Sequence, residues 1–139
     1  MADQFDETFL AYFEDEFKIE PGLPVKLMYR KSDPLALAFI FEEFDVEREW
    51  LVSRDLIGDV VLKGASQGEG NLRIDLRTMP GCGCRGVRFH FVDQYGWRDA
   101  TFHYGEIYTV IGAAFMMVPQ HQESACINID SFIDEVLKG

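Results

Sequence analysis

Two cysteines and two histidines in the second half of the chain have side chains that can bind a metal ion. Cys82 and Cys84 stand in the segment GCGC, and His90 and His103 follow on predicted strands. Paired cysteines of zinc sites usually have two residues between them, whereas this pair has one. We therefore expect no metal here and interpret both cysteines as reduced, readily oxidised loop thiols. The sequence does not decide their role.

The nucleophilic and glycine-rich residues form no pattern typical of an enzyme. His90, His103 and His121 are the three histidines, and no GxSxG motif supplies a nucleophile for them. The glycine-rich segment 63–71 leads into a predicted strand, whereas a P-loop needs GxxxxGK[ST] before a helix. We interpret it as a hairpin-type connection in which Gly68 and Gly70 have positive φ. The sequence thus predicts no catalytic residue and no cofactor, and a protein that works by binding.

The charge of the chain is strongly negative but unevenly distributed. The formal net charge is -11 and the pI is about 4.6, which disfavours general binding to nucleic acid or to anionic membranes. Acidic residues are concentrated in the first twenty positions and in 42–49. Four arginines, with aromatic residues nearby, point to the alternative of a single-stranded nucleic-acid-binding module; they are Arg73, Arg77, Arg88 and Arg98. An ordinary polar sheet face, or a face that meets the acidic surface of another copy, explains them equally.

Length and composition predict one domain over residues 1–139. The 47% of hydrophobic residues can form a core. The acidic start MADQFDET lacks the features of a secretory signal, so we expect a cytoplasmic protein with three reduced cysteines and no disulfide framework. The longest apolar segment, 107–118, is shorter than the roughly 20 residues of a membrane span.

The first half of the chain predicts mainly strands. Residues 5–17 fit a helix and a strand equally, since phenylalanines recur every fourth position. Residues 21–24 (PGLP) predict a turn, 25–30 a strand, 32–34 a second turn, and 35–41 a strand buried on both faces. A strand at 49–52 precedes a short helix that begins after Ser53 and that Gly58 should end early.

The second half predicts further strands and then helices. Apolar and polar residues alternate over 72–77 and 87–92, and a turn at 94–96 connects the latter to a strand at 97–104. Apolar residues of 107–118 follow helical spacing up to Pro119. An extended piece at 126–129 and a final helix from Asp130 or Ser131 to Leu137 complete the order strands, short helix, strands, helix, helix.

Four segments, in this order and spacing, resemble the SsgA-like proteins of sporulating actinomycetes. They are Leu27-Met28-Tyr29, Asp33-Pro34-Leu35-Ala36, the stretch WLVSRDL at 50–56, and GEGNLRI at 68–74. The loop at 81–86 and the acidic N-terminus depart from the family pattern. The resemblance implies an α+β fold, in which helices pack on a curved antiparallel sheet similar to that of whirly-type single-strand-binding proteins.

The resemblance also implies a function without catalysis. Members of the family take part in sporulation-specific cell division, where they recruit the tubulin-like protein FtsZ to septa or position the septum. We therefore expect an adaptor that binds cell-division proteins at septa and assembles as a homotrimer. The family motif carries over to these positions as candidate partner-binding residues: Tyr29, Asp33, Pro34, Trp50, Arg54, Asp55, Leu56, Gly68 and Gly70. For most of them a structural role is the competing interpretation: burial for Trp50 and Leu56, turn geometry for Asp33, Pro34 and the glycines, and a helix-start ion pair for Arg54 with Asp55.

Overall fold

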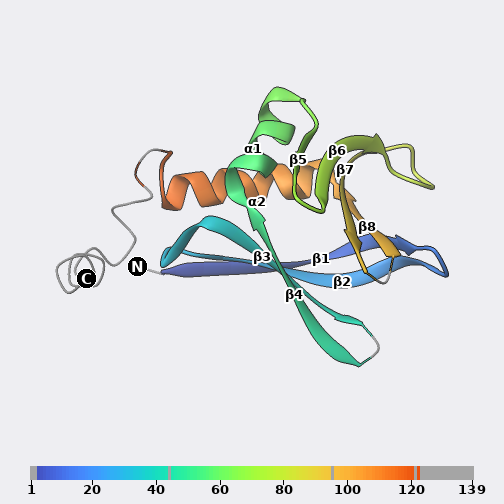
Figure 1. Cartoon of the computed structure of the whole chain (residues 1–139). Helices are drawn as coiled ribbons and strands as arrows, with labels where there is room; N and C mark the ends of the chain where they lie inside the picture. Colours follow the sequence, from blue (N-terminus) through green and yellow to red (C-terminus); the bar gives the residue numbers. More distant parts are fainter. Residues whose placement is uncertain (1–2, 44, 95, 121, 123–139) are drawn as a thin grey trace.

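A single antiparallel sheet of eight strands and two helices make up the computed structural model, which describes residues 3–43, 45–94, 96–120 and 122. The elements are β1 (Gln4–Asp15), β2 (Ile19–Arg30), β3 (Asp33–Glu43), β4 (Val46–Ser53), α1 (Arg54–Lys63), β5 (Gln67–Glu69), β6 (Leu72–Thr78), β7 (Arg85–Asp93), β8 (Gly96–His103) and α2 (Tyr104–Met117). The strand order is β4-β3-β2-β1-β8-β7-β6-β5, so the first and last strands of the chain pair at the middle of the sheet. This α+β architecture confirms the predicted order up to α2 (Figure 1). The predicted extended piece and final helix lie outside the described residues.

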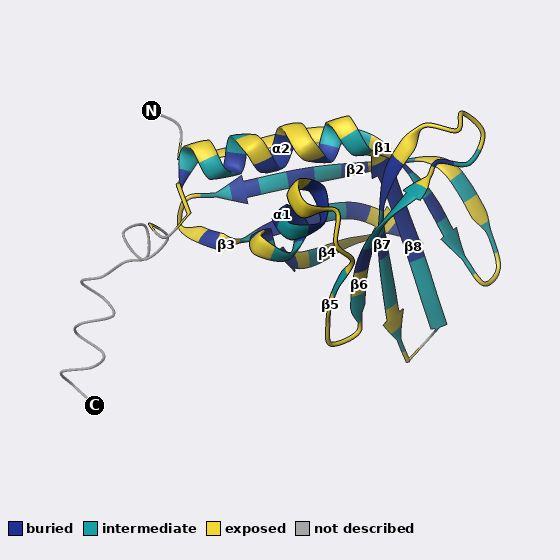
Figure 2. Cartoon of the chain, turned by 90° about the horizontal axis from the view of Figure 1, so that it is seen from above, coloured by how far each residue is buried: buried dark blue, intermediate teal, exposed yellow. Residues whose placement is uncertain are grey.

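The sheet is curled, and both helices lie on its inner side. Figure 2 shows α1 and α2 beside each other, with buried residues along the surfaces that face the strands. Phe39 of β3 contacts Phe89 of β7 with ring centroids 4.8 Å apart, although three strands separate β3 from β7 in the sheet. The curl therefore closes one apolar core between the two halves of the sheet and the helices. In the described part of the chain, neither helix is long and apolar enough to cross a membrane.

The N-terminal segment, which fitted a helix and a strand equally, is strand β1. It pairs with β2 from Gln4 opposite Arg30 onward, and its end pairs with β8. Phe5, Phe9 and Phe13 lie on the inner face, because positions four apart share a face in a strand as well as in a helix. Only pairing with distant strands separates the two possibilities.

The predicted turn at 21–24 was wrong, since these residues belong to β2. Pro24 lies opposite Leu10 of β1. The ladder between β2 and β3 begins only at Lys26, opposite Ile40. Before that point β2 has a neighbour on one side only, and an open side tolerates a residue without a backbone N–H.

The strand at 35–41 is β3, but it is not buried on both faces throughout. Leu37 and Phe39 are buried on the inner face and Ala38 on the outer face, whereas Leu35 is 50% exposed. The ladder to β4 begins only at Ala36, opposite Ser53, so Leu35 lies beyond the covered part of the strand.

Helix α1 is longer than predicted. Ser53 caps it as expected, because its hydroxyl accepts a hydrogen bond from the backbone N–H of Leu56 at 3.4 Å. Gly58 does not end it, and the helix continues to Lys63 with Gly64 as its C-cap at φ 72°. A Cβ at Gly58 would lie 3.1 Å from the ring of Phe115. The glycine thus allows α1 and α2 to approach closely, and the helix packing outweighs its low intrinsic propensity.

Candidate functional site

Arg54, the first residue of α1, is fully buried although it carries a charge. Its Nη1 donates hydrogen bonds to the hydroxyl of Tyr29 at 3.0 Å and to the carbonyl oxygen of Val118 at 2.6 Å. Its guanidinium lies 4.1 Å from the ring centroid of Phe115, a cation–π distance. A buried charge needs such partners to be stable. Through these contacts Arg54 connects the start of α1 to β2 and to the end of α2.

Several of the motif residues lie in or beside this buried network. The hydroxyl of Tyr29 donates to the carbonyl oxygen of Pro34 at 2.9 Å, which ties the start of β3 to β2. The expected pair of Arg54 with Asp55 is present at 4.0 Å between Nε and Oδ1. Asp33 is exposed at the first position of β3, beside a turn at 31–32 instead of within it. Tyr29, Pro34 and Arg54 therefore hold the fold together, and a buried position leaves them little surface for a partner.

Trp50 and Leu56 occupy a more accessible place. Both are partly buried against the core and both line a hollow of about 510 Å³ between the β4 end of the sheet and the β5–β6 hairpin; its lining includes Trp50, Leu51, Leu56, Glu69, Asn71 and Phe91. We call this hollow the hairpin groove. The curl of the sheet forms it, because β4 and β5 are the opposite edges of the strand order.

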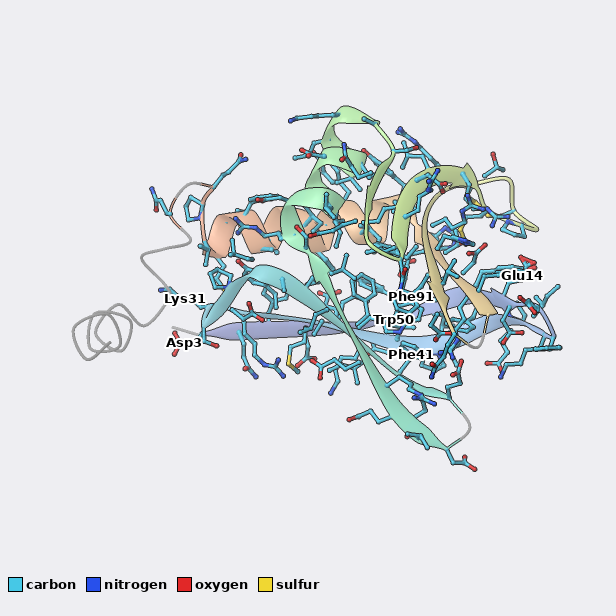
Figure 3. The ribbon with its side chains drawn as sticks, in the orientation of Figure 1. Asp3, Glu14, Lys31, Phe41, Trp50 and Phe91 are labelled. Carbon is cyan, nitrogen blue, oxygen red and sulfur yellow. A yellow bond between two sulfur atoms is a disulfide. The ribbon has the colours of Figure 1, made fainter. Side chains whose placement is uncertain are left out.

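Two aromatic side chains, Trp50 and Phe91, line the hairpin groove, and the buried Phe41 packs against Trp50. Trp50 of β4 stacks on Phe91 of β7 with centroids 5.2 Å apart, and Phe41 of β3 meets the edge of Trp50 at 4.8 Å. Figure 3 shows these three labelled side chains converging between the two halves of the sheet. Glu49 and Glu69 line the same groove, so its apolar floor is bordered by carboxylates.

The two motif glycines belong to the hairpin that borders this groove, and only one has the predicted backbone. Gly70 has φ 58°, as expected for the turn between β5 and β6. Gly68 does not have a positive φ; it lies in β5 opposite Arg73, where a Cβ would meet the carbonyl oxygen of Leu72 at 3.3 Å. The glycine at position 68 therefore serves close strand approach instead of turn geometry.

The four arginines of the alternative nucleic-acid face do not share one face. Arg88 lies opposite Asp75 and Thr101, whereas Arg98 lies opposite Phe91. Because Arg88 and Phe91 are three positions apart on β7, they point to opposite faces of the sheet. Arg98 therefore faces the inner side, where Nη1 lies 2.9 Å from Glu43 Oε1.

Acidic partners also offset the positive charge that the arginines of the alternative nucleic-acid face would offer to a ligand. Arg88 donates to both carboxylate oxygens of Asp75, at 2.9 and 2.6 Å, and lies 3.7 Å from Asp99. The hydrogen bond with Asp75 raises the pKa of Arg88, so the residue stays charged but compensated. Arg73 lines a hollow of about 920 Å³ together with Arg88 and His90. Among the described residues, no carboxylate lies within salt-bridge distance of Arg73. Arg77 donates a hydrogen bond to the carbonyl oxygen of Thr78 at 3.4 Å. Arg73 is exposed and Arg77 is half-buried, and two such cations make a weak site for a polyanion.

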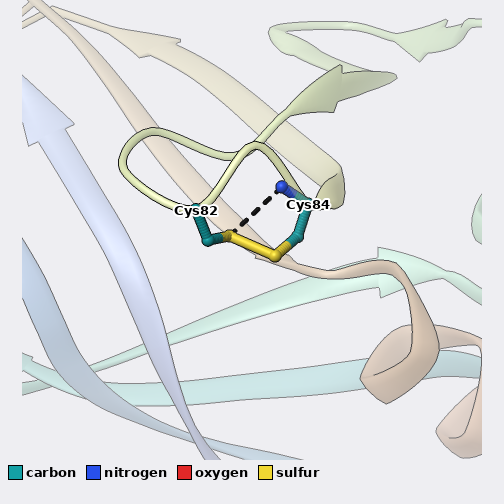
Figure 4. Close-up of a disulfide and its surroundings, with 2 residues drawn as sticks. All are labelled: Cys82 and Cys84. Atoms are coloured by element: carbon teal, nitrogen blue, oxygen red, sulfur yellow. Dashed lines mark hydrogen bonds between the residues drawn. A yellow bond between two sulfur atoms is a disulfide. The ribbon is translucent and has the colours of Figure 1, made fainter.

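The cysteine loop differs from the expectation of reduced thiols. Cys82 and Cys84 form a disulfide in the structure (Figure 4). Their Cα atoms are 5.3 Å apart, a separation within the usual range for bonded cysteines. The odd count of cysteines and the lack of a secretory signal had favoured thiols, but neither prevents two of the three from bonding to each other.

Sequence reasoning missed two groups of residues that connect distant elements. Phe115 and Val118 complete the environment of Arg54, and Glu43 with Asp93 binds Arg98, whose Nη2 lies 3.4 Å from Asp93 Oδ2. The sequence shows the charge of Arg98 and the apolar spacing in α2. No local pattern, however, indicates which distant residues contact them.

No family model matches the sequence, and no curated protein matches it. Two cell division proteins are among the solved structures that are similar to the chain in three dimensions. One is SsgB, a protein whose mutations correlate with longitudinal cell division during sporulation of Streptomyces coelicolor. It is 17% identical in sequence and superposes with a TM-score of 0.72, and the match covers 91% of this chain and 99% of SsgB. An SsgA-like sporulation-specific cell division protein from Thermobifida fusca is 23% identical with a TM-score of 0.72, covering 97% and 98%. The chain therefore has the fold of the SsgA-like cell division proteins.

Proposed function

We propose that the chain is a member of the SsgA-like family and acts as a non-catalytic adaptor in sporulation-specific cell division. It helps to recruit or position the FtsZ machinery at septa. The fold shared with two sporulation cell division proteins, over nearly the whole of each, carries this proposal. The order of the motif segments along the chain adds to it. Fold alone does not determine function, so the partner must be tested directly.

The hairpin groove is the surface that we assign to the partner. Aromatic side chains that are partly exposed in a hollow are typical of binding hot spots. Its apolar floor and the carboxylates of Glu49 and Glu69 fit a segment of a division protein that presents an apolar side chain next to a lysine or arginine. Tyr29, Pro34 and Arg54 support this surface from within the fold.

Co-sedimentation with polymers of FtsZ from the same organism tests the proposal. We expect the wild-type chain to pellet with the polymers and Glu69→Lys to pellet several-fold less. Glu7→Lys makes the same charge change at an exposed position of β1 outside the groove and should pellet like wild type. Absence of wild-type co-sedimentation would contradict the FtsZ role, whereas equal pelleting of both variants would reject the hairpin groove alone.

Assembly and location are finer parts of the same proposal. We expect a homotrimer in the cytoplasm at division septa. Leu10, which is 62% exposed, lies on the outer face of the sheet and favours contact with another copy. Sedimentation equilibrium measures the assembly state, and a purely monomeric protein at micromolar concentration would contradict the trimer.

An oligonucleotide titration tests the alternative function. We expect no binding of single-stranded DNA or RNA near physiological salt, because the net charge is negative and Arg88 is compensated. Salt-dependent binding that the double substitution Arg73→Ala and Arg88→Ala abolishes would instead support a nucleic-acid-binding module.

A further inference from the structure

The pairing of β7 with β8 brings a histidine next to the cysteine loop. Gly86, two residues after Cys84, lies opposite His103 at the end of β8. One ligand atom from each of Cys82, Cys84 and His103 lies within 4.8 Å of the other two. His90 is not part of this cluster, since its Nδ1 contacts the carboxylate of Asp99. The fold thus selects one histidine of the two that the sequence offered.

The loop itself orients both sulfur atoms. Gly81 and Gly83, at φ 92° and 72°, have backbone conformations that place Cys82 in a tight turn. The backbone N–H of Met79 donates to the carbonyl oxygen of Cys84 at 2.6 Å and closes the loop at its base. The side chain of Met79 is buried and anchors this base. The backbone of the cysteine loop is therefore held by its glycine conformations and by its own hydrogen bond.

A backbone donor already reaches one of the two sulfur atoms. The backbone N–H of Cys84 donates to the Sγ atom of Cys82 at 3.2 Å (Figure 4). The thiolate is the form of a cysteine that binds metals, so the loop must lose two thiol protons when an ion binds.

We propose that Cys82, Cys84 and His103 form a redox-controlled zinc site. Two thiolates and one imidazole are a ligand set that suits Zn²⁺, and the fourth tetrahedral position remains for water. Two thiolate charges balance the charge of the ion. The site does not depend on the proposed role in cell division.

In the disulfide form the sulfur atoms cannot bind the ion. A thiol reductant must first transfer two electrons: two of its thiols become one disulfide, and Cys82 and Cys84 each receive a hydrogen atom. Zn²⁺ then displaces one proton from each cysteine thiol, so that binding releases two protons per ion. The redox state of the surroundings thereby decides whether the loop holds the metal.

Metal titration of the whole chain tests this site. All proteins carry Cys126→Ser, because Cys126 is the third thiol and lies outside the described residues. Zn²⁺ is titrated against a chromogenic chelator, and Co²⁺ is titrated while the thiolate-to-cobalt charge-transfer absorption is recorded. We expect one ion per chain after reduction with a phosphine and none after oxidation. Cys82→Ser should abolish the charge-transfer absorption.

The two histidines provide a matched comparison. His103→Ala should weaken Zn²⁺ binding at least about tenfold, because loss of even an outer-shell partner costs about 10–100-fold, whereas His90→Ala should leave the affinity unchanged. Circular dichroism verifies that each variant is folded. Absence of binding by the reduced protein, equal affinities of the two histidine variants, or binding that survives Cys82→Ser with Cys84→Ser would overturn the proposal.

Discussion

Replacing Arg54 by alanine tests whether its buried guanidinium holds α1 and the end of α2 together. The side chain is fully buried, so water cannot replace its hydrogen bonds. Without it the carbonyl oxygen of Val118 loses a donor at 2.6 Å, which costs about 1–3 kcal/mol. The lost contact with Phe115, at 4.1 Å, costs about 2 kcal/mol when desolvated. We expect the free energy of unfolding to fall by about 3–5 kcal/mol, since both losses occur together.

Urea denaturation followed by tryptophan fluorescence measures this change. Asp55→Asn is the control, because Asp55 is largely exposed and its atoms lie 4.0 Å from Arg54; we expect a loss of less than about 1 kcal/mol. If Arg54→Ala does not fold, Tyr29→Phe removes one hydroxyl from the same network and should cost about 1–3 kcal/mol. A loss for Arg54→Ala no larger than that for Asp55→Asn would refute the role assigned to the buried arginine.

Two further predictions concern the helices. Gly58→Ala should lower the melting temperature, because the new Cβ would lie 3.1 Å from Phe115 and overpacking costs about 1–3 kcal/mol. Gly112→Ala should raise the melting temperature, because no atom lies within 4 Å of the new Cβ and alanine favours the helix by about 1 kcal/mol over glycine. Calorimetry compares the two, and shifts of the same sign would contradict the packing. Burial raises the pKa of Glu106 above its ordinary 4.5, and His103 opposes this only partly. This carboxyl therefore favours folding below its unfolded pKa and loses that contribution as the pH rises through the folded pKa. Glu106→Gln should accordingly raise the melting temperature at about pH 7 but not at about pH 4. Equal shifts of the melting temperature at both pH values would contradict a raised pKa of Glu106.

Local patterns in the sequence were sufficient for most elements. The alternation of Leu72, Ile74 and Leu76 with charged residues predicted strand β6, and the apolar spacing in 107–118 predicted α2. Ser53 marked the start of α1 correctly. These features were predictable because the periods of strands and helices are properties of a few neighbouring residues. Charge and composition likewise disfavoured general binding to polyanions without any knowledge of the fold.

Contacts between distant segments decided the rest. Within the ambiguous segment 5–17, residues up to Asp15 became a strand because β2 and β8 pair with them, and α1 continued past Gly58 because Phe115 packs there. Register placed Arg98 on the opposite face from Arg88, and the same ladder placed His103 beside the cysteine loop.

The motif residues show the same division. Their order along the chain indicated the fold, but their roles depend on which distant partners each one meets. Arg54 is buried because Val118 and Tyr29, far away in sequence, accept its hydrogen bonds. Trp50 borders a groove because the sheet curls until its two edges approach. The residue types and their spacing thus predicted most helices and strands and contained no enzyme motif. Only the tertiary structure decided which motif side chains are buried within the fold and which face solvent, because burial is a property of the assembled core.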